Sequence, residues 1–365
     1  MQHFTGTSES SAETLLRESL PQLASDIKAL RIPELLAVCL GGGYGRGEGG
    51  VRKTSDGAFT LYNDLDLFTI VRTGTPKSAR QRIVRELGAI SQHWSQILKV
   101  DVDFSYPVTL HEMKRNSRKL MMQELVRGHI VLVGDANLIR KTIPILPPES
   151  LPKLEAMRLM FNRGMGLLFA HERLNSLNEN SQQPDFDFIN RNLNKCVLGI
   201  GDSWLMMIGE YRWGIEERAE LIEKLKPDTL GRDFPRRYRE AVQRKFTPSS
   251  ILPPDVLRIV NELREQWLMT ICTFVGQPSQ YLIYPDAIAA SLHLFCRKNH
   301  LCGIRNFLRW FIRTGDIELS NTTFDEPLIK ALALLFRAHV NDYQQLQEFS
   351  EEERAWLQKL WQLFN

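Results

Sequence analysis

The spacing of apolar residues changes near residue 143 of this 365-residue chain. Before that point, four short apolar runs predict β-strands, at residues 35–40, 64–71, 99–108 and 129–135. Stretches with helical spacing predict helices at residues 12–30, 78–98 and 110–127. An Asp56–Gly57 pair predicts a hairpin turn before the second strand. The first part of the chain is therefore expected to form a small domain around a mixed sheet.

Beyond the proline-rich segment IPILPPESLP (143–152), strand patterns nearly vanish and helical spacing dominates. We therefore expect an α+β protein, with a small mixed-sheet domain at residues 1–142 and an all-α helical domain at residues 151–365. A second proline-rich stretch, SSILPPD at residues 249–255, is a candidate point for subdividing the helical domain.

Composition narrows the class of protein. The 46 Lys and Arg residues nearly balance 43 Asp and Glu, so the net charge of +3 gives no strong electrostatic case for a nucleic-acid partner. No apolar run approaches the roughly 18 residues of a membrane span. The five cysteines are odd in number and contain no C-x-x-C pair, so neither a disulfide framework nor a zinc site is predicted. These features predict a cytoplasmic protein with reduced thiols and no membrane attachment.

Acidic residues on two predicted strands carry the candidate chemistry. Asp64 and Asp66 are two positions apart, so both carboxylates project from one face of the strand, roughly 6–7 Å apart along the chain. Two acids this close repel one another unless a cation lies between them, and Mg²⁺ prefers hard oxygen ligands. Asp101 and Asp103 repeat this spacing on the next strand. Three such carboxylates can hold two metal ions about 3.5–4 Å apart, and one can take the proton from an attacking hydroxyl.

A glycine-rich segment, GGGYGRGEGG (41–50), precedes these acids. Glycines let backbone N–H groups approach an anion without a Cβ atom in the way, and Arg46 supplies a guanidinium group for phosphate oxygens. Glu48 has two interpretations, as a brace of the loop or as a group near the nucleotide. The nucleotide-binding residues predicted here are Gly42, Gly43, Tyr44, Arg46 and Gly47. A phosphate cradle followed by metal-binding carboxylates indicates phosphoryl or nucleotidyl transfer.

The order of these features resembles the DNA polymerase β-type nucleotidyltransferase superfamily: an apolar strand, Gly-Gly, Arg-Gly, a variable hairpin, Asp-Leu-Asp-Leu and a later strand acid. GGYGRGE is similar to the corresponding segment of the uridylyltransferases that modify nitrogen-signalling proteins, and VDVDFSYPV resembles the third-carboxylate strand of bacterial aminoglycoside adenylyltransferases. The resemblance covers roughly residues 10–140. It implies a catalytic and metal-binding set of Asp64, Asp66 and Asp103, with Asp101 as the alternative third acid.

Two departures from the superfamily pattern affect the prediction of which nucleotide binds more than the prediction of which reaction takes place. The superfamily usually has Gly-Ser where this chain has Gly42–Gly43, so backbone N–H groups must hold phosphate without a hydroxyl. The 20 residues between Gly43 and Asp64 also exceed the common spacing, which we interpret as a longer hairpin that carries Arg52 and Lys53.

In the helical half, Arg191 and Lys195 lie at positions i and i+4 on one face of a predicted helix. Because helical domains appended to these enzymes commonly direct a basic side chain toward the triphosphate, the resemblance makes Lys195 a candidate nucleotide-binding residue. Tyr211 and Trp213 are interpreted mainly as packing residues.

These features together predict a Mg²⁺-dependent nucleotidyltransferase with two metal ions. It is expected to move a nucleoside monophosphate, with AMP from ATP favoured, to a hydroxyl acceptor with release of pyrophosphate. The acceptor class, a small molecule or a protein, stays open, and nucleic acid is disfavoured because the net charge is near zero. The alternative is a non-catalytic nucleotide sensor that signals to a partner through its helical domain.

Overall fold

The computed structural model describes residues 3–7, 10–54, 57–176, 186–248, 254–276, 291, 326–340 and 350–364. The chain divides into two compact units. The first contains Met1–Leu151, Trp213–Ile215 and Val242–Ser249, and the second contains Pro152–Arg212, Glu216–Ala241 and Ser250–Asn365. The division after Leu151 falls in the first proline-rich segment. Most of the second proline-rich stretch, residues 249–253, lies outside the described residues.

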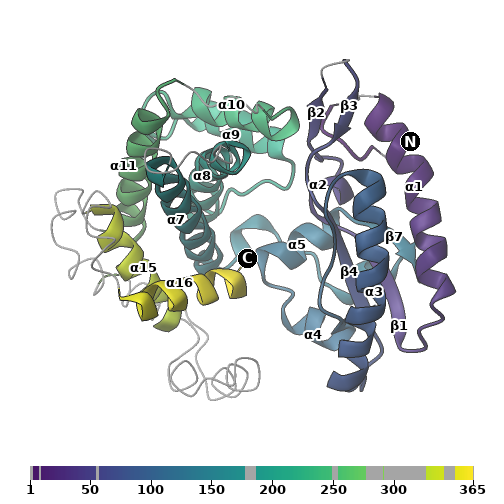
Figure 1. The fold of residues 1–365 in the computed structure, drawn as a ribbon. Coiled ribbons are helices and arrows are strands. Elements are labelled where there is room, and N and C mark those ends of the chain that lie inside the picture. The colour runs from purple at the N-terminus through teal and green to yellow at the C-terminus, as the bar shows by residue number, and fades with distance from the viewer. Residues whose placement is uncertain are drawn as a thin grey trace. The chain divides into compact units, whose positions relative to one another are not determined.

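A mixed sheet forms the centre of the first unit, which confirms the expected mixed α/β content of this part of the chain (Figure 1). In the described residues it has five strands, β1 (Leu35–Leu40), β4 (Leu65–Val71), β5 (Val102–Phe104), β6 (Val108–Thr109) and β7 (Ile130–Val133). Their order is β5-β4-β1-β7, and β6 also lies beside β4. β1 is antiparallel to β4 and β7, whereas β5 and β6 are parallel to β4. The antiparallel pairing places the end of β1 beside the start of β4.

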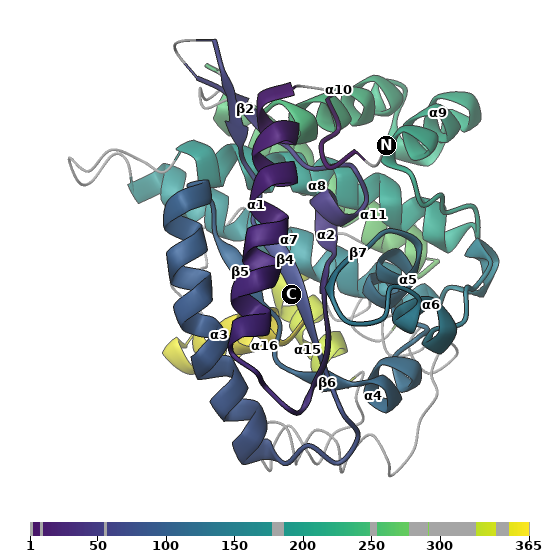
Figure 2. The same ribbon diagram turned by 90° about the vertical axis from the view of Figure 1, so that its right-hand side faces the viewer.

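Helices cover both faces of this sheet. On one face lie α1 (Ser10–Ala29) and α3 (Lys77–Leu98), which Figure 2 shows side by side. On the other face lie α4 (Leu110–Arg115), α5 (Leu120–Arg127) and α6 (Leu138–Thr142). Because side chains alternate along a strand, Leu65 and Leu67 of β4 join the core beneath α1 and α3, while Ile70 joins the core beneath the other helices.

The predictions of one strand at 99–108 and one helix at 110–127 are wrong, because each region forms two elements. Ser105 ends β5: its N–H donates to the Leu67 carbonyl (2.7 Å), but its hydroxyl takes the N–H of Thr69 (3.0 Å) in place of a backbone acceptor. Pro107, directly before β6, has no backbone N–H and therefore cannot donate a hydrogen bond to β4. Between α4 and α5, the side-chain amide of Gln123 donates to the Ser117 carbonyl (2.6 Å) and holds a turn.

A hairpin fills the long interval between the glycines and the acids, as expected. β2 (Val51–Lys53) and β3 (Phe59–Leu61) pair antiparallel after the short helix α2 (Gly42–Gly45). At the tip, the Thr54 N–H donates to the Ala58 carbonyl (2.8 Å), and Gly57 has φ of +87°. Asp56 of the predicted turn lies outside the described residues.

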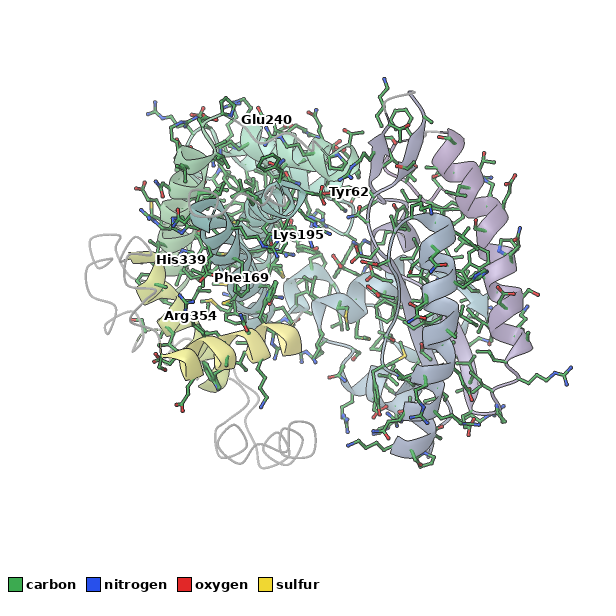
Figure 3. All side chains as sticks on the ribbon, viewed as in Figure 1. Tyr62, Phe169, Lys195, Glu240, His339 and Arg354 are labelled. Carbon is green, nitrogen blue, oxygen red and sulfur yellow. The ribbon has the colours of Figure 1, made fainter. Side chains whose placement is uncertain are left out.

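The second unit is helical in its described residues, which confirms the expectation of a helical C-terminal part. Trp267 packs within this unit: the indole N–H donates to the Met160 carbonyl (2.8 Å), and the ring centroid lies 4.7 Å from that of His339. Figure 3 labels His339. These contacts join three helices of the unit. The described elements from residue 148 onward are η1 (Pro148–Ser150), α7 (Lys153–Ser176), α8 (Phe186–Met207), α9 (Ile215–Leu225), η2 (Asp228–Leu230), α10 (Phe234–Phe246), α11 (Val256–Phe274), α15 (Glu326–Val340) and α16 (Glu351–Phe364).

Among the described helices, none combines the length and the hydrophobicity that crossing a lipid bilayer requires. Cys39, Cys196 and Cys272 are buried free thiols. Burial raises the pKa of Cys39 and Cys196 to about 12 and that of Cys272 to about 11, so these thiols stay protonated at neutral pH. Cys296 and Cys302 lie outside the described residues.

Candidate active site

The acids of the second and third predicted strands lie on one side of the sheet. Asp66 of β4 is directly opposite Asp103 of β5 in the parallel register. Their neighbours Leu65 and Val102 are buried in the core beneath α1 and α3, so both carboxylates project from the opposite face. Adjacent strands are about 4.8 Å apart, which makes the two acids close neighbours. Asp64 precedes β4 directly and shares the face of Asp66 by the two-residue period of a strand.

Electrostatic repulsion acts between these acids. Partial burial raises the pKa of Asp103, and the nearby charges of Asp64 and Asp101 raise it further. Asp101 lies just before β5, where its carbonyl accepts the N–H of Leu65 (2.8 Å). A bound cation would offset this repulsion by favouring the ionised carboxylates. Negative charge is therefore in excess where these acids lie, at the start of β4 and β5.

The glycine segment lies against this acidic edge. The Gly41 N–H donates to the carbonyl of Asp66 (2.8 Å), and Gly42 begins α2 with φ of +58°. A Cβ atom at Gly42 would lie 1.9 Å from Oδ2 of Asp66, so no side chain fits between the backbone and the carboxylate. The first N–H groups of a helix have no partner within it, which leaves those of Gly42, Gly43 and Tyr44 available to an anion. Backbone donors and carboxylates therefore lie next to each other at the end of β1.

The carboxylate oxygens of these acids are the type of ligand that a hard divalent cation prefers. Asp66 and Asp103 are both solvent-exposed, so their side chains can turn toward an ion, and carboxylate oxygens are preferred Mg²⁺ ligands. In the described part of the chain, no group of three or more His, Cys, Asp or Glu side chains is already gathered as metal ligands. Holding a metal with three of the acids would therefore require their side chains to rotate.

Tyr44 has a structural position behind the site. Its buried hydroxyl donates to the Gly50 carbonyl (2.8 Å) and accepts the N–H groups of Tyr62 (3.0 Å) and Asn63 (3.3 Å). It thereby closes the base of the β2–β3 hairpin, one residue before Asp64. Burial raises the pKa of Tyr44 to about 12, so the phenol keeps the proton that it donates.

Replacing Tyr44 by Phe should lower the free energy of unfolding by about 2 kcal/mol, because three buried or partly buried backbone groups lose their partner. Urea denaturation measures this change. Tyr106→Phe is the matched control: Tyr106 is 49% exposed, and its substitution should change stability by less than about 0.5 kcal/mol. Equal stability of Tyr44→Phe and the parent protein would show that the hydroxyl does not hold the hairpin.

Glu48 joins the glycine loop to segments from later in the chain. Its carboxylate accepts the Ile215 N–H (2.9 Å), pairs with Lys245 (2.8 Å) and lies 3.4 Å from Arg46. Arg46 also pairs with Glu124 of α5 (3.1 Å). Ile215 and Lys245 belong to the ranges grouped with the first unit. Of the two interpretations of Glu48, these contacts support the brace of the loop.

Glu48→Ala should lower the free energy of unfolding by about 2–4 kcal/mol, since it leaves two largely buried cations without this carboxylate. Thermal and urea unfolding both measure the loss. Lys141→Ala removes a 68% exposed partner of an ion pair and should cost less than about 0.5 kcal/mol. Similar losses in the two variants would contradict the bracing role.

The remaining predicted nucleotide-binding residues lie away from the acidic edge or in the second unit. The Gly47 N–H donates to the Tyr44 carbonyl (3.3 Å), so it is already used within the turn. Lys195 is exposed on α8 of the second unit (Figure 3). Tyr211 is buried, and Trp213 stacks against the guanidinium group of Arg127 at 3.5 Å. The expectation that both aromatic residues pack is therefore confirmed.

A pocket of about 330 Å³ lies at the other end of α2, and the sequence analysis did not predict it. Its lining residues are His3, Gly45, Arg46, Gly47, Arg127, Gly128, His129 and Arg140. Gly45, Arg46 and Gly47 belong to the glycine-rich segment. The others are His3, the consecutive residues 127–129 and Arg140, which are far apart along the chain, so no local spacing could have brought them together in a prediction.

The chain matches no known protein-family model and no curated protein sequence. The resemblance to polymerase β-type nucleotidyltransferases therefore depends on the motifs and on the placement of the acids beside the glycines.

Proposed function

We propose that the chain is a Mg²⁺-dependent nucleotidyltransferase that transfers a nucleoside monophosphate, with AMP favoured, from a nucleoside triphosphate to a hydroxyl acceptor. One observation carries this proposal: Asp66 and Asp103 are paired across adjacent parallel strands, with the backbone of Gly42 directly against the Asp66 carboxylate. This juxtaposition supports binding of a cation and a phosphate group within a few ångströms of each other.

Each residue has a distinct role in this proposal. Asp64, Asp66 and Asp103 would hold two Mg²⁺ ions, which neutralise charge on the phosphate oxygens when bound. The N–H groups of Gly42, Gly43 and Tyr44 donate to the triphosphate, and the absence of a Cβ at Gly42 lets it approach Asp66. Asp103 is also the candidate base for the acceptor hydroxyl, because an ionised carboxylate beside the metal ions can accept a proton from a hydroxyl bound there.

Arg46 and Lys195 have less direct roles. Arg46 already pairs with Glu48 and Glu124, so we assign it to holding the glycine turn in shape. A direct contact with the β- and γ-phosphates would require it to leave one of these carboxylates. Lys195 stays a candidate for the triphosphate from the second unit, on the strength of the resemblance alone.

The proposal is tested with ATP labelled in the α-phosphate or the γ-phosphate. The chain is incubated with Mg²⁺, a panel of hydroxylated small molecules, and proteins that include the chain itself. We expect the α-label to appear on an acceptor and pyrophosphate to be released in equal amount. Transfer of the γ-label would instead identify a kinase and contradict the proposal. The identity of the labelled acceptor decides between a small molecule and a protein.

The Glu48 contacts favour a second candidate, a nucleotide sensor. They link the loop beside the acids to Ile215 and Lys245, which border the helical part of the chain. A sensor would bind ATP and Mg²⁺ in calorimetry and protect residues 213–215 and 242–248 from hydrogen exchange without turnover. Label transfer to any acceptor at a catalytic rate would exclude a purely sensing role.

A further inference from the structure

We propose that the pocket at the far end of α2 is a second anion site, which binds a small phosphate-bearing molecule through Arg127, Arg140 and His129. All its lining residues belong to the first unit. They include neither the acids nor Gly42, although Arg46 and Gly47 of the glycine segment are part of the lining. The inference therefore goes beyond the proposed function and does not require it.

Positive charge in this pocket is not balanced by its neighbours. Arg127 donates to the side chain and carbonyl of Gln123 and to the carbonyl of Leu146, and its face stacks on Trp213. All of these partners are uncharged. Arg140 is exposed on α6, and within the described residues no carboxylate pairs with either arginine. Two arginines that line one cavity and pair with no carboxylate of the described residues favour an anionic ligand.

Arg46 also lines this pocket but, unlike Arg127 and Arg140, it pairs with carboxylates of the described residues. Its charge is matched by Glu48 and Glu124, so it contributes to the wall more than to the net charge. The excess charge is therefore that of Arg127 and Arg140. Burial lowers the pKa of Arg127, which is the cost of holding a cation there and which a bound anion would offset.

His129 makes the site selective for phosphate. It is 8% exposed, and its Nδ1 lies 2.8 Å from the Leu125 carbonyl, an acceptor, so Nδ1 carries the proton. Burial lowers the pKa of His129 and the Arg140 charge lowers it further, whereas the hydrogen bond to Leu125 raises it. The net lowering favours the neutral ring, in which Nε2 is an acceptor. Inorganic phosphate keeps an O–H at neutral pH that can donate to Nε2, and a phosphate monoester carries one in its monoanion, below its second pKa of about 6. Sulfate has no such proton.

The size of the pocket limits the ligand. About 330 Å³ is at the lower end of the range for small-molecule sites, which is enough for a phosphate group with a small attached body. The expected ligand is therefore free phosphate or a small phosphate monoester.

Isothermal titration calorimetry of the whole chain, without Mg²⁺ or nucleotide, tests the proposal. The titrants are inorganic phosphate, ribose 5-phosphate, and sulfate at matched ionic strength. With the titrations run near pH 6, where the monoester is partly protonated, we expect both phosphate compounds to bind at least about tenfold more tightly than sulfate, because sulfate cannot donate to His129. Tighter binding of ribose 5-phosphate would identify an ester as the ligand, and tighter binding of inorganic phosphate would identify the free ion. Equal affinity for phosphate and sulfate, or no binding, would overturn the proposal.

Substitutions locate the binding. Arg140→Ala should weaken phosphate binding by about tenfold or more, and Arg127→Lys should weaken it while keeping the charge and the fold. Arg85→Ala, an exposed arginine on α3 outside the pocket, is the matched control and should leave the affinity unchanged. Asp66→Asn should also leave it unchanged, which separates this site from the proposed active site. Equal weakening in Arg140→Ala and Arg85→Ala, or loss of binding in Asp66→Asn, would contradict the assignment.

Discussion

Asp66→Asn and Asp103→Asn should each lower the rate of nucleotidyl transfer by about 10³-fold, without loss of stability. The two carboxylates are opposite each other on β4 and β5, and an amide of the same size supplies neither the charge nor the ligand strength that a divalent cation needs. Both side chains are exposed, so neither substitution opens a cavity. Initial rates with α-labelled ATP measure the first effect, and urea denaturation measures the second.

The stability effect has a predicted sign. Burial and the charges of Asp64 and Asp101 raise the pKa of Asp103 in the folded protein, so folding favours the neutral form of this group. Its contribution to the free energy of unfolding is therefore largest at low pH and is lost as the pH rises through the folded pKa. Because Asn is neutral at all pH values, Asp103→Asn should be equal to or slightly more stable than the parent at pH 7.

Two control variants separate a metal site from general charge effects. Glu18→Gln removes an exposed acid of α1 far along the chain from these strands and should leave the rate unchanged. Asp101→Asn should reduce the rate less than Asp103→Asn does, because Asp101 precedes β5 and Asp103 is the residue opposite Asp66. A larger loss in Asp101→Asn would contradict the choice of Asp103. Full activity in Asp66→Asn would remove the metal assignment.

Gly42→Ala should abolish most of the activity at a modest cost in stability. The new methyl group would lie 1.9 Å from Oδ2 of Asp66, and a carboxylate at the end of a rotatable side chain can relieve that clash by swinging away. The residue also has φ of +58°, which costs an alanine about 1–2 kcal/mol. Displacing Asp66 should lower the transfer rate by about 10²-fold or more, since misplacing one catalytic group by an ångström has effects of that size.

Gly88→Ala is the matched control for this substitution. Gly88 lies within α3, where a Cβ atom would have no neighbour within 4 Å. Alanine should therefore raise the free energy of unfolding by about 0.5–1 kcal/mol and leave transfer unchanged. If Gly42→Ala retained parental activity while losing stability, the glycine would serve only the turn, and its contact with Asp66 would have no catalytic meaning.

The sequence predicted the elements whose signals are local. The apolar run at 35–40 is β1, and helical spacing located α1 and α3 to within two residues at each end. The break between β5 and β6 was missed because it depends on Ser105 bonding to β4, a contact that no local pattern encodes. The same holds for the turn between α4 and α5, which the side chain of Gln123 stabilises.

The sequence likewise predicted only those features of the candidate site that have local signals. The two-residue spacing of Asp64 and Asp66 predicted a shared face, but the register that sets Asp66 opposite Asp103 is fixed by how the α3 crossover packs. The pairing of Arg46 with Glu124 could not be predicted, because Glu124 lies 78 positions further along the chain. Motifs supply the types of residues at a site, and tertiary packing decides which of them meet.

We propose that the acids of β4 and β5 hold divalent cations beside the glycine turn. A crystal of the chain grown with Mn²⁺ and a non-hydrolysable ATP analogue tests it most directly, through anomalous difference density collected near the manganese edge. We expect a peak between Asp66 and Asp103, within about 2.3 Å of carboxylate oxygens, with the triphosphate against Gly42 and Gly43. Bound nucleotide with no anomalous peak at these acids, or a peak elsewhere in the chain, would contradict it.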